Sequence, residues 1–414
     1  MSPPRRHTLL IFSQTFVPDP AAVGQHMADI AIAMARRGHR VIVYASARGY
    51  EDPRQRYPRR ENLQGVEVRR FPIASFGKSS IPLRVAGTLV FMFQCLIAGL
   101  FTRGVDGILF STSPPLIGLI AGIVHIVRNI PIAYWAMDLN PDQLIALKKI
   151  APNGLVAGVL ETVNRFILRQ SALVIALDRF MAERLRSRAN LPGQLIVLPP
   201  WPHEEHIQLP LPEERNSFRA EHHLDGKFVV MYSGNHSPSN PLTTVLDAAV
   251  QLKDDPDIVF LFVGGGSGKR EVERTIRGRN ARNVISLPYQ PLERLGQSLS
   301  AADVHIVALG EPMVGIIHPC KIYGAMTVGR PVLYFGPKPS HISDLLESEP
   351  FGLHVAHGDV DGAVRAIRQL KEMGDAQLGE LGSRGRRVLG ERLSQQMLRD
   401  RLCDALEVSL RLTD

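Results

Sequence analysis

Residues 8–46 read TLLIFSQTFVPDPAAVGQHMADIAIAMARRGHRVIVYAS, two apolar runs with a helical pattern between them. The runs at 8–13 and 40–46 have the length and apolar content of buried strands. Between them, Met27, Ile30 and Met34 recur at helical spacing, and Gly38 stands where a helix commonly ends. A strand, a helix and a second strand in this order predict a βαβ unit, and therefore a parallel sheet.

The same alternation continues along the chain. In the first half, further strands are predicted at 65–73, 106–112, 131–138 and 172–178, and in the second half at 228–235, 258–266, 283–290, 304–309 and 331–336. A Pro-rich, polar segment at about 199–226 separates the two halves. We therefore expect an α/β protein with two Rossmann-like doubly wound domains facing an interdomain cleft. The expected divisions are 1–205, 206–385 and a C-terminal helix, 386–414, that crosses back to the first domain.

The charge is unevenly distributed. Residues 1–200 carry 24 Lys and Arg against 12 Asp and Glu, whereas the remaining residues carry 24 against 28. A basic half suits an anionic membrane surface or an anionic substrate. The alternative for a single cluster such as RQRYPRR is a solvated surface. No nucleic-acid-binding signature accompanies the charge, so nucleic acid is not an expected partner.

The cysteines and the N-terminus indicate a reducing compartment. Cys95, Cys320 and Cys403 are odd in number and far apart, which argues against a disulfide framework and against a zinc site. The apolar run at the N-terminus is too short for a signal peptide. We expect a cytoplasmic protein.

Two apolar segments are unusual for a plain soluble domain. Residues 85–101 carry no charge and lie between Arg84 and Arg103, and residues 114–127 carry one histidine. Seventeen residues is at the lower limit of about 17–25 for crossing a bilayer. A buried helix, an interfacial helix and a membrane span all remain open for 85–101.

Several glycines stand at predicted strand-to-helix turns. Gly24 enters a helix, where backbone N–H groups approach a phosphate, although an ordinary tight turn explains it equally well. VGGGSGK resembles a P-loop, but Arg270 replaces the Ser or Thr that would hold magnesium, so ATP hydrolysis is rejected. Gly234, Asn235 and His236 end a strand, where glycine permits close backbone approach and the other two offer hydrogen bonds.

Acidic and basic side chains mark two more strand ends. Asp138 follows a strand and is positioned to orient or deprotonate a hydroxyl. Asp142 is interpreted as a helix N-cap. In HPCK, Lys321 stands at a helix start, where a bound phosphate would satisfy it, and Cys320 is interpreted as a packing residue.

The whole set resembles a known family. The stretches, in order, are FVPDPAAVG, STSPPLIGLIAGIV, MDLNPD, ALDRFMAERL, VLPPWP, MYSGNHS, FVGGG, LPYQPLERLGQSLSAADVHIV and HPCKIYGAMTVGRPVL. Over about residues 8–400 the chain resembles glycosyltransferase family 4, the retaining enzymes of GT-B architecture. It is most similar to the branch of colanic-acid and O-antigen-type sugar transferases, which work in bacterial cell-surface polysaccharide biosynthesis.

The resemblance implies the roles of individual residues. It implies Asp138 and Lys321 as catalytic residues and no metal or other cofactor. The donor, a nucleotide diphosphate sugar, would be bound by these residues: Gly24, Gly234, Asn235, His236, Gly265, Tyr289, Gly315, His318 and Lys321. The implied acceptor is a saccharide, and the apolar helices and the basic half favour a lipid-linked one. We expect a location on the inner face of the plasma membrane.

The chain departs from the family at two positions. Much of the family carries two glutamates with seven residues between them, and here Ile316 and Gly324 occupy those positions. The cations that often follow the SGN loop are also absent. Two alternatives therefore stay open: a sugar-nucleotide epimerase on the same architecture, and a non-catalytic partner protein.

Overall fold

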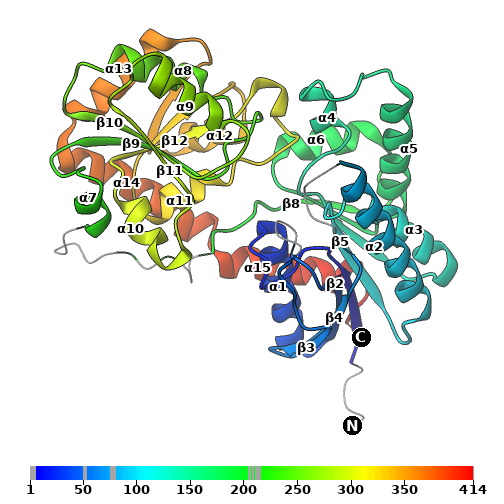
Figure 1. Cartoon of the computed structure of the whole chain (residues 1–414). Coiled ribbons are helices and arrows are strands. Elements are labelled where there is room, and N and C mark those ends of the chain that lie inside the picture. The colour runs from blue at the N-terminus through cyan, green and yellow to red at the C-terminus, as the bar shows by residue number, and fades with distance from the viewer. Residues whose placement is uncertain are drawn as a thin grey trace. The chain divides into compact units, whose positions relative to one another are not determined.

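The computed structural model describes residues 6–49, 54–74, 81–203, 207, 209 and 216–413 (Figure 1). Two compact units form. The first contains Met1–Pro200, Gly315–Ile317 and Gln396–Asp414, and the second contains Trp201–Val314 and His318–Gln395. The domain boundary predicted at 205/206 lies outside the described residues.

The first unit is built on an eight-stranded sheet of order β3-β4-β2-β1-β5-β6-β7-β8. Its strands are β1 (Thr8–Phe12), β2 (Arg40–Ser46), β3 (Arg60–Leu63), β4 (Val66–Phe71), β5 (Gly107–Ser111), β6 (Ile132–Trp135), β7 (Leu173–Ala176) and β8 (Gln194–Val197). Its helices are α1 (Ala22–Arg36), α2 (Ile81–Phe101), α3 (Ile117–Arg128), α4 (Asp142–Ala146), α5 (Leu155–Gln170), α6 (Arg179–Arg188) and α15 (Gln395–Ser409). Every described strand pair except β3–β4 is parallel, as the βαβ pattern predicts.

Both faces of this sheet are covered. Leu10 and Phe12 of β1 join the core beneath α2 and α3, which contribute Phe91 and Ile120 among others. The alternate residue Leu9 is also fully buried, which requires helices on the opposite face. Met27, Ile30 and Met34 of α1, predicted to share one face, are all fully buried.

The sequence did not predict the antiparallel strand β3. It pairs with β4 through a turn at Gln64 and Gly65, whose φ angles of 49° and 92° are both positive, as a tight hairpin requires. The preceding basic cluster concealed the strand. Buried Arg70 of β4 donates to Glu61 of β3 and to the Pro58 carbonyl oxygen, so these bonds add to the pairing of the two strands.

The C-terminal helix α15 belongs to the first unit. Arg37 of α1 donates to Asp404 and Glu407, and the ring of His39 is 2.9 Å from Glu407. Gly107 in β5 leaves room for Leu410, whose Cβ would lie 3.0 Å from a Cβ at that glycine. Ion pairs and apolar contacts together hold this distant segment on the first sheet.

The second unit is built on a six-stranded parallel sheet of order β11-β10-β9-β12-β13-β14. Its strands are β9 (Phe228–Ser233), β10 (Ile258–Val263), β11 (Val284–Leu287), β12 (Val304–Ala308), β13 (Val332–Phe335) and β14 (Gly352–Val355). Its helices are α7 (Ser217–Glu221), α8 (Thr243–Gln251), α9 (Lys269–Gly278), η2 (Leu292–Arg294), α10 (Leu295–Ser300), η3 (Glu311–Met313), α11 (Lys321–Thr327), α12 (His341–Ser348), α13 (Val360–Glu372) and α14 (Gly374–Arg392).

The core of the second unit has two layers. Val230 and Phe260 lie in a large cluster with α8 and α13, whereas the alternate residues Val229 and Leu261 lie in a smaller cluster with Phe218 of α7. The strands are therefore buried on both faces, which explains their nearly continuous apolar runs. The predicted fold class, an α/β protein with two Rossmann-like domains, is confirmed.

We expect Leu406→Ala to destabilise the first unit selectively. Leu406 is fully buried on α15, so its truncation leaves a cavity that costs about 2–4 kcal/mol of unfolding free energy. Denaturation with hydrogen exchange should show lost protection in β1 and β5. Val408→Ala on the same helix is the control, since Val408 is 70% exposed. Equal effects of the two changes would contradict the docking of α15.

Candidate functional site

The loops that follow β9 and β10 meet at one edge of the second sheet. β9 has β10 on one side and β12 on the other, so the order of the strands reverses between β9 and β12. Ligands of doubly wound sheets bind beyond the carboxyl ends of the strands at such a point. Gly234, Asn235 and His236 follow β9 there, and Gly264 and Gly265 follow β10.

Close contact between these two loops requires glycine. Gly264 has a φ of +132°, and a Cβ on it would collide with the carbonyl oxygen of Gly234. Gly234 itself has a φ of +124°, and Gly266 has a φ of +114° with Asn235 against it. Only glycine adopts such φ values readily, so the GGG run serves the packing of backbone on backbone.

Hydrogen bonds join the two loops and leave some N–H groups unused. The His236 N–H donates to the Gly265 carbonyl oxygen at 2.7 Å, and the Gly268 N–H donates to the His236 carbonyl oxygen at 2.8 Å. Among the described residues, the N–H groups of Asn235 and Gly265 have no acceptor. Free backbone N–H groups at such a strand end can bind an anion.

Lys321, the first residue of α11, lies beside this loop pair. Its Cε is 3.0 Å from where a Cβ on Gly234 would stand, and its Nζ is 5.3 Å from the ring centre of Tyr232. No described carboxylate pairs with it. Burial lowers the pKa of Lys321, because a desolvated ammonium without a counter-charge is costly. A bound anion would remove that cost.

Lys269 is chemically similar but structurally different. Its ammonium donates to the carbonyl oxygens of Gly264 at 2.8 Å and of Leu287 at 2.7 Å. It therefore joins the ends of β10 and β11 and shapes the loop. This use of the lysine agrees with the rejection of a P-loop from the sequence.

His236 is buried and neutral. Burial lowers its pKa, and the nearby cations Lys269 and Lys321 lower it further. Its Nδ1 lies 3.2 Å from the carbonyl oxygen of Gly265, which can only accept, so Nδ1 carries the hydrogen. The imidazole thus supports the loop and adds no positive charge.

Tyr289 completes this group of predicted residues. It follows β11, is 59% exposed, and its ring edge would lie 2.9 Å from a Cβ on Gly265. A flat aromatic surface next to the loop suits stacking with a planar ligand group. The structure therefore brings together six predicted residues: Gly234, Asn235, His236, Gly265, Tyr289 and Lys321.

His318 and Cys320 differ from this group. His318 is buried, and its Nε2 is 2.7 Å from the Tyr323 hydroxyl while its ring lies 4.3 Å from that of His341. Cys320 is exposed, so its interpretation as a packing residue was wrong. Its Sγ lies 3.5 Å from the His318 carbonyl oxygen.

The first sheet has its own switch point, between β1 and β5. The Gln14 N–H donates to the Ser113 carbonyl oxygen at 3.1 Å there. Gly24 lies in the first turn of α1, where a Cβ would be 3.0 Å from the backbone of Phe16. Its N–H donates to Ala21, so packing explains this glycine directly.

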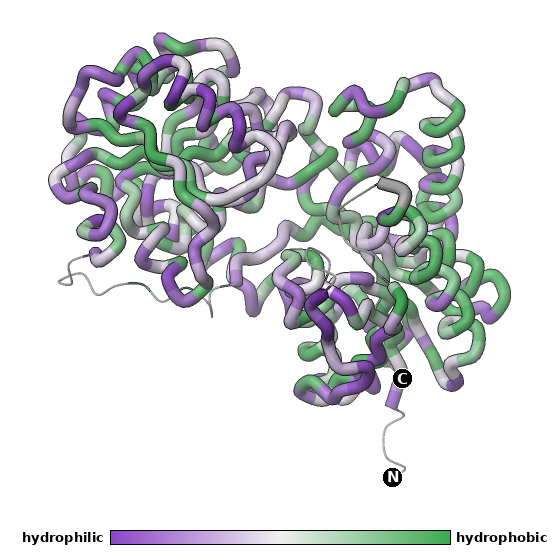
Figure 2. Tube along the Cα trace, in the orientation of Figure 1, coloured by the Kyte–Doolittle hydropathy of each residue, from purple (hydrophilic) through white to green (hydrophobic). Residues whose placement is uncertain are grey.

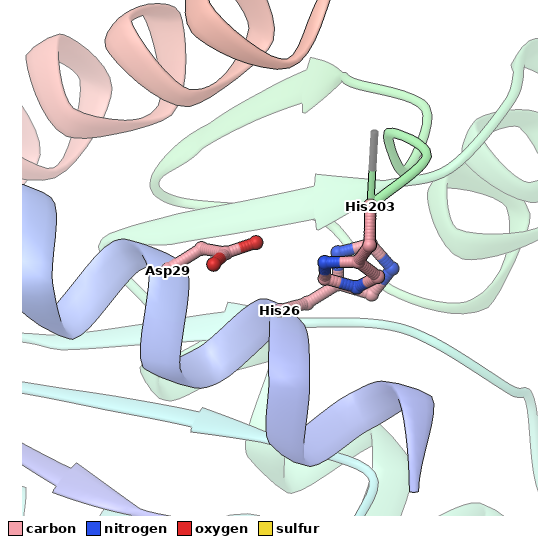
Figure 3. A group of neighbouring side chains, drawn as sticks. All are labelled: His26, Asp29 and His203. Carbon is pink, nitrogen blue, oxygen red and sulfur yellow. The ribbon is translucent and has the colours of Figure 1, made fainter. Parts of the chain in front are cut away.

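The same helix presents two polar side chains one turn apart. His26 and Asp29 extend from one side of α1 (Figure 3). His26 is buried, and its ring lies 6.0 Å from that of Trp135 in β6. These side chains add polar groups to the first unit that the sequence did not single out.

Asp138 follows β6 in the first unit. Burial raises its pKa to about 6, and no described residue bonds its carboxylate. A carboxylate with a pKa near neutrality can exchange a proton at physiological pH. The prediction that the neighbouring Asp142 caps a helix was wrong, because Pro141 occupies the N-cap position of α4. The carboxylate of Asp142 instead forms an ion pair with Arg188.

Position 316, one of the two where the family resemblance leads us to expect a glutamate, is buried in the first unit. The carbonyl oxygen of Ile316 accepts a hydrogen bond of 3.0 Å from the N–H of Leu139, the residue after Asp138. Gly315 has a φ of +69°, and a Cβ on it would lie 2.7 Å from the backbone of Phe180, so it too is held by close packing. Gly324 on α11 has space, since only Leu299 approaches a Cβ there, at 3.6 Å.

Family models match most of the chain. A glycosyl transferase 4-like domain matches residues 21–201, and a domain of the glycosyl transferases group 1 matches residues 227–372. The first match contains β2 to β8, and the second contains all six strands of the second sheet.

Two curated relatives carry glycosyltransferase names. The chain is 24% identical over 305 residues to the probable glycosyltransferase WbjE of Pseudomonas aeruginosa, covering 74% of this chain and 75% of the relative. It is 26% identical over 218 residues to the putative colanic acid biosynthesis glycosyl transferase WcaI of Escherichia coli strain K12, covering 52% and 53%.

Solved structures share the fold. Sucrose-phosphate synthase of Thermosynechococcus elongatus superposes with a TM-score of 0.77 at 18% identity, over 99% of this chain and 100% of the other. The Anabaena HepE protein, solved with UDP and glucose, superposes with a TM-score of 0.70 at 16% identity, over 97% and 100%. Given the two matched domains and these relatives, the chain belongs to the family 4 glycosyltransferases of GT-B fold.

Proposed function

We propose that this glycosyltransferase moves a sugar from a nucleotide diphosphate sugar to a lipid-linked saccharide, with retention of configuration. The observation that carries the donor assignment is the desolvated ammonium of Lys321 beside the N–H groups of Asn235 and Gly265, none of which has a partner among the described residues. A diphosphate would pair with the ammonium and accept hydrogen bonds from the two N–H groups. HepE, which shares the fold, is described in complex with UDP and with glucose.

The proposed reaction exchanges one bond at the anomeric carbon. The bond to the diphosphate oxygen breaks as a bond to the acceptor hydroxyl oxygen forms on the same face, and the hydroxyl proton leaves to a base. We assign Lys321 to the negative charge that develops on the leaving diphosphate, a type of stabilisation worth about 3 kcal/mol per group. We assign Asp138 to the acceptor hydroxyl. No metal or other cofactor enters this scheme.

The acceptor and the cellular role are inferred from chemistry and from one relative. The excess of positive charge in residues 1–200 suits an anionic lipid surface. WcaI is named for colanic acid biosynthesis. We therefore propose a role in bacterial cell-surface polysaccharide biosynthesis, at the inner face of the plasma membrane.

The direct test uses purified full-length protein. A thermal-shift panel of nucleotide sugars should identify a stabilising donor, and that donor should lose its sugar only when a lipid-linked saccharide is added. Conversion of the donor without any acceptor would indicate the epimerase instead. No shift with any nucleotide sugar would favour a non-catalytic protein.

We expect Lys321→Met to lower transfer by about a hundredfold while leaving the free protein as stable or more stable. The reason is that the ammonium is desolvated and has no described counter-charge in the free protein. Donor titration and denaturation of the same sample measure both effects. Lys269→Met is the matched control: loss of its two carbonyl contacts should lower the unfolding free energy by about 1–3 kcal/mol. Normal transfer by Lys321→Met would refute the assignment.

The raised pKa of Asp138 predicts that the rate of transfer and the free energy of unfolding both depend on pH. Its pKa of about 6 means that the carboxylate forms as pH rises through 6, so transfer should increase there and Asp138→Asn should remove that limb of the profile. Because the folded pKa lies above the ordinary 3.8, folding takes up a proton between about pH 4 and 6.

The sign of the stability effect follows from that proton uptake. The free energy of unfolding falls as pH rises through the window, so Asp138→Asn should stabilise the protein at pH 8 by roughly 1–3 kcal/mol and have little effect below pH 4. Denaturation at the two pH values measures this difference. A rate profile that Asp138→Asn leaves unchanged would exclude a role for Asp138 in transfer.

A further inference from the structure

Helix α2 has two opposite apolar stripes, of which one is buried and one is exposed. Phe91, Met92 and Cys95 lie in the core of the first unit. On the other side the exposed residues recur every four positions and are all apolar: Val85 52%, Leu89 59%, Phe93 63%, Ile97 45% and Phe101 77%. At 1.5 Å per residue this exposed stripe is about 24 Å long.

The neighbouring helix α3 extends the exposed surface. Arg128 at the end of α3 donates to the carbonyl oxygens of Gly99 at 2.6 Å and of Thr102 at 2.7 Å, so the two helix ends lie side by side. Ile126 and Val127 are 60% and 65% exposed there. Figure 2 shows both helices as a largely apolar layer, and we name the exposed side chains of α2 and α3 the α2–α3 face.

The charges around this face are positive. Neither α2 nor α3 contains an acidic residue. Arg84 and Arg103 are exposed, stand at the two ends of the stripe, and form no ion pair with any described residue. Arg84 lies near the start of α2, and Arg103 lies two residues after its last residue, Phe101.

We propose that the α2–α3 face docks onto an anionic bilayer, with α2 lying in the plane of the interface. An in-plane helix puts the apolar stripe at the acyl boundary and both arginines at the level of the anionic headgroups. This docking surface would give the proposed lipid-linked acceptor its access. It is tested without donor or acceptor, so it stands or fails separately from the proposed reaction.

Two other uses of the face fit the structure less well. Leu83–Phe101 is long and apolar enough to cross a membrane by length and composition. A crossing, however, would remove Phe91, Met92 and Cys95 from the core that they share with Phe12 and Phe110. Antiparallel pairing with a second copy would bring Arg84 of one protein next to Arg103 of the other, which like charges oppose.

Vesicle co-sedimentation of the full-length protein tests this docking. Wild type should bind phosphatidylglycerol-rich vesicles, and the double variant Phe93→Asp, Ile97→Asp should bind at least tenfold more weakly. Arg84→Gln and Arg103→Gln should each weaken binding about fivefold, and only on anionic vesicles. Val408→Asp, an exposed apolar residue of α15, should bind like wild type.

Three results would overturn the proposal. The first is wild-type binding that the double variant retains, or no wild-type binding at all. The second is membrane-bound protein that resists alkaline carbonate extraction, which would indicate a span. The third is a wild-type dimer in the absence of vesicles that Phe93→Asp converts to a monomer. Unchanged near-ultraviolet circular dichroism and thermal midpoints would show that each variant is folded.

Discussion

The contact of Gly264 with the carbonyl oxygen of Gly234 sets the geometry of the whole candidate donor site. Two neighbouring strand ends come so close that no side chain fits between them. The backbone then bonds across the loops through His236 and Gly265, and the remaining N–H groups face no described acceptor. Positive charge and free donors are thus concentrated by backbone packing, before any ligand is considered.

The two lysines near this contact show why the location of a charge matters more than its presence. Lys269 is satisfied by two carbonyl oxygens, whereas Lys321 is desolvated next to an aromatic ring without a described anionic partner. A protein tolerates such an ammonium when a ligand supplies the opposite charge. At 316 and 324, where the family resemblance leads us to expect glutamates, the chain carries Ile and Gly. The buried setting of Ile316 shows that its position now serves packing.

The first unit combines a conventional core with an unconventional surface. Helix α2 contributes to the core through one stripe and exposes a second, equally apolar stripe to solvent. Monomeric soluble proteins rarely expose apolar patches of this extent without a partner. The same helix can therefore remain an integral part of the fold and also form the proposed docking surface, whereas a membrane span would remove its buried stripe from the core.

The sequence by itself determined the α/β class, the two domains and the order of the motifs. These depend on periodicities of two and 3.6 residues and on glycines at turns, which are local properties. It also placed Gly234, Asn235, His236, Gly265, Tyr289 and Lys321 at strand ends that share one sheet edge. It missed the strand β3, because a basic cluster masked the hairpin. It also interpreted Asp142 as a helix cap, whereas Asp142 pairs with Arg188, which lies 46 residues away in the chain.

Only the tertiary structure decided which lysine is free, which glycines are required by backbone contact, and which face of α2 is buried. Each of these depends on a partner that is distant in the chain, such as Leu287 for Lys269 or Phe12 for Phe91. Sequence patterns report the local preference of a residue, whereas its protonation, burial and pairing are set by neighbours that only folding supplies.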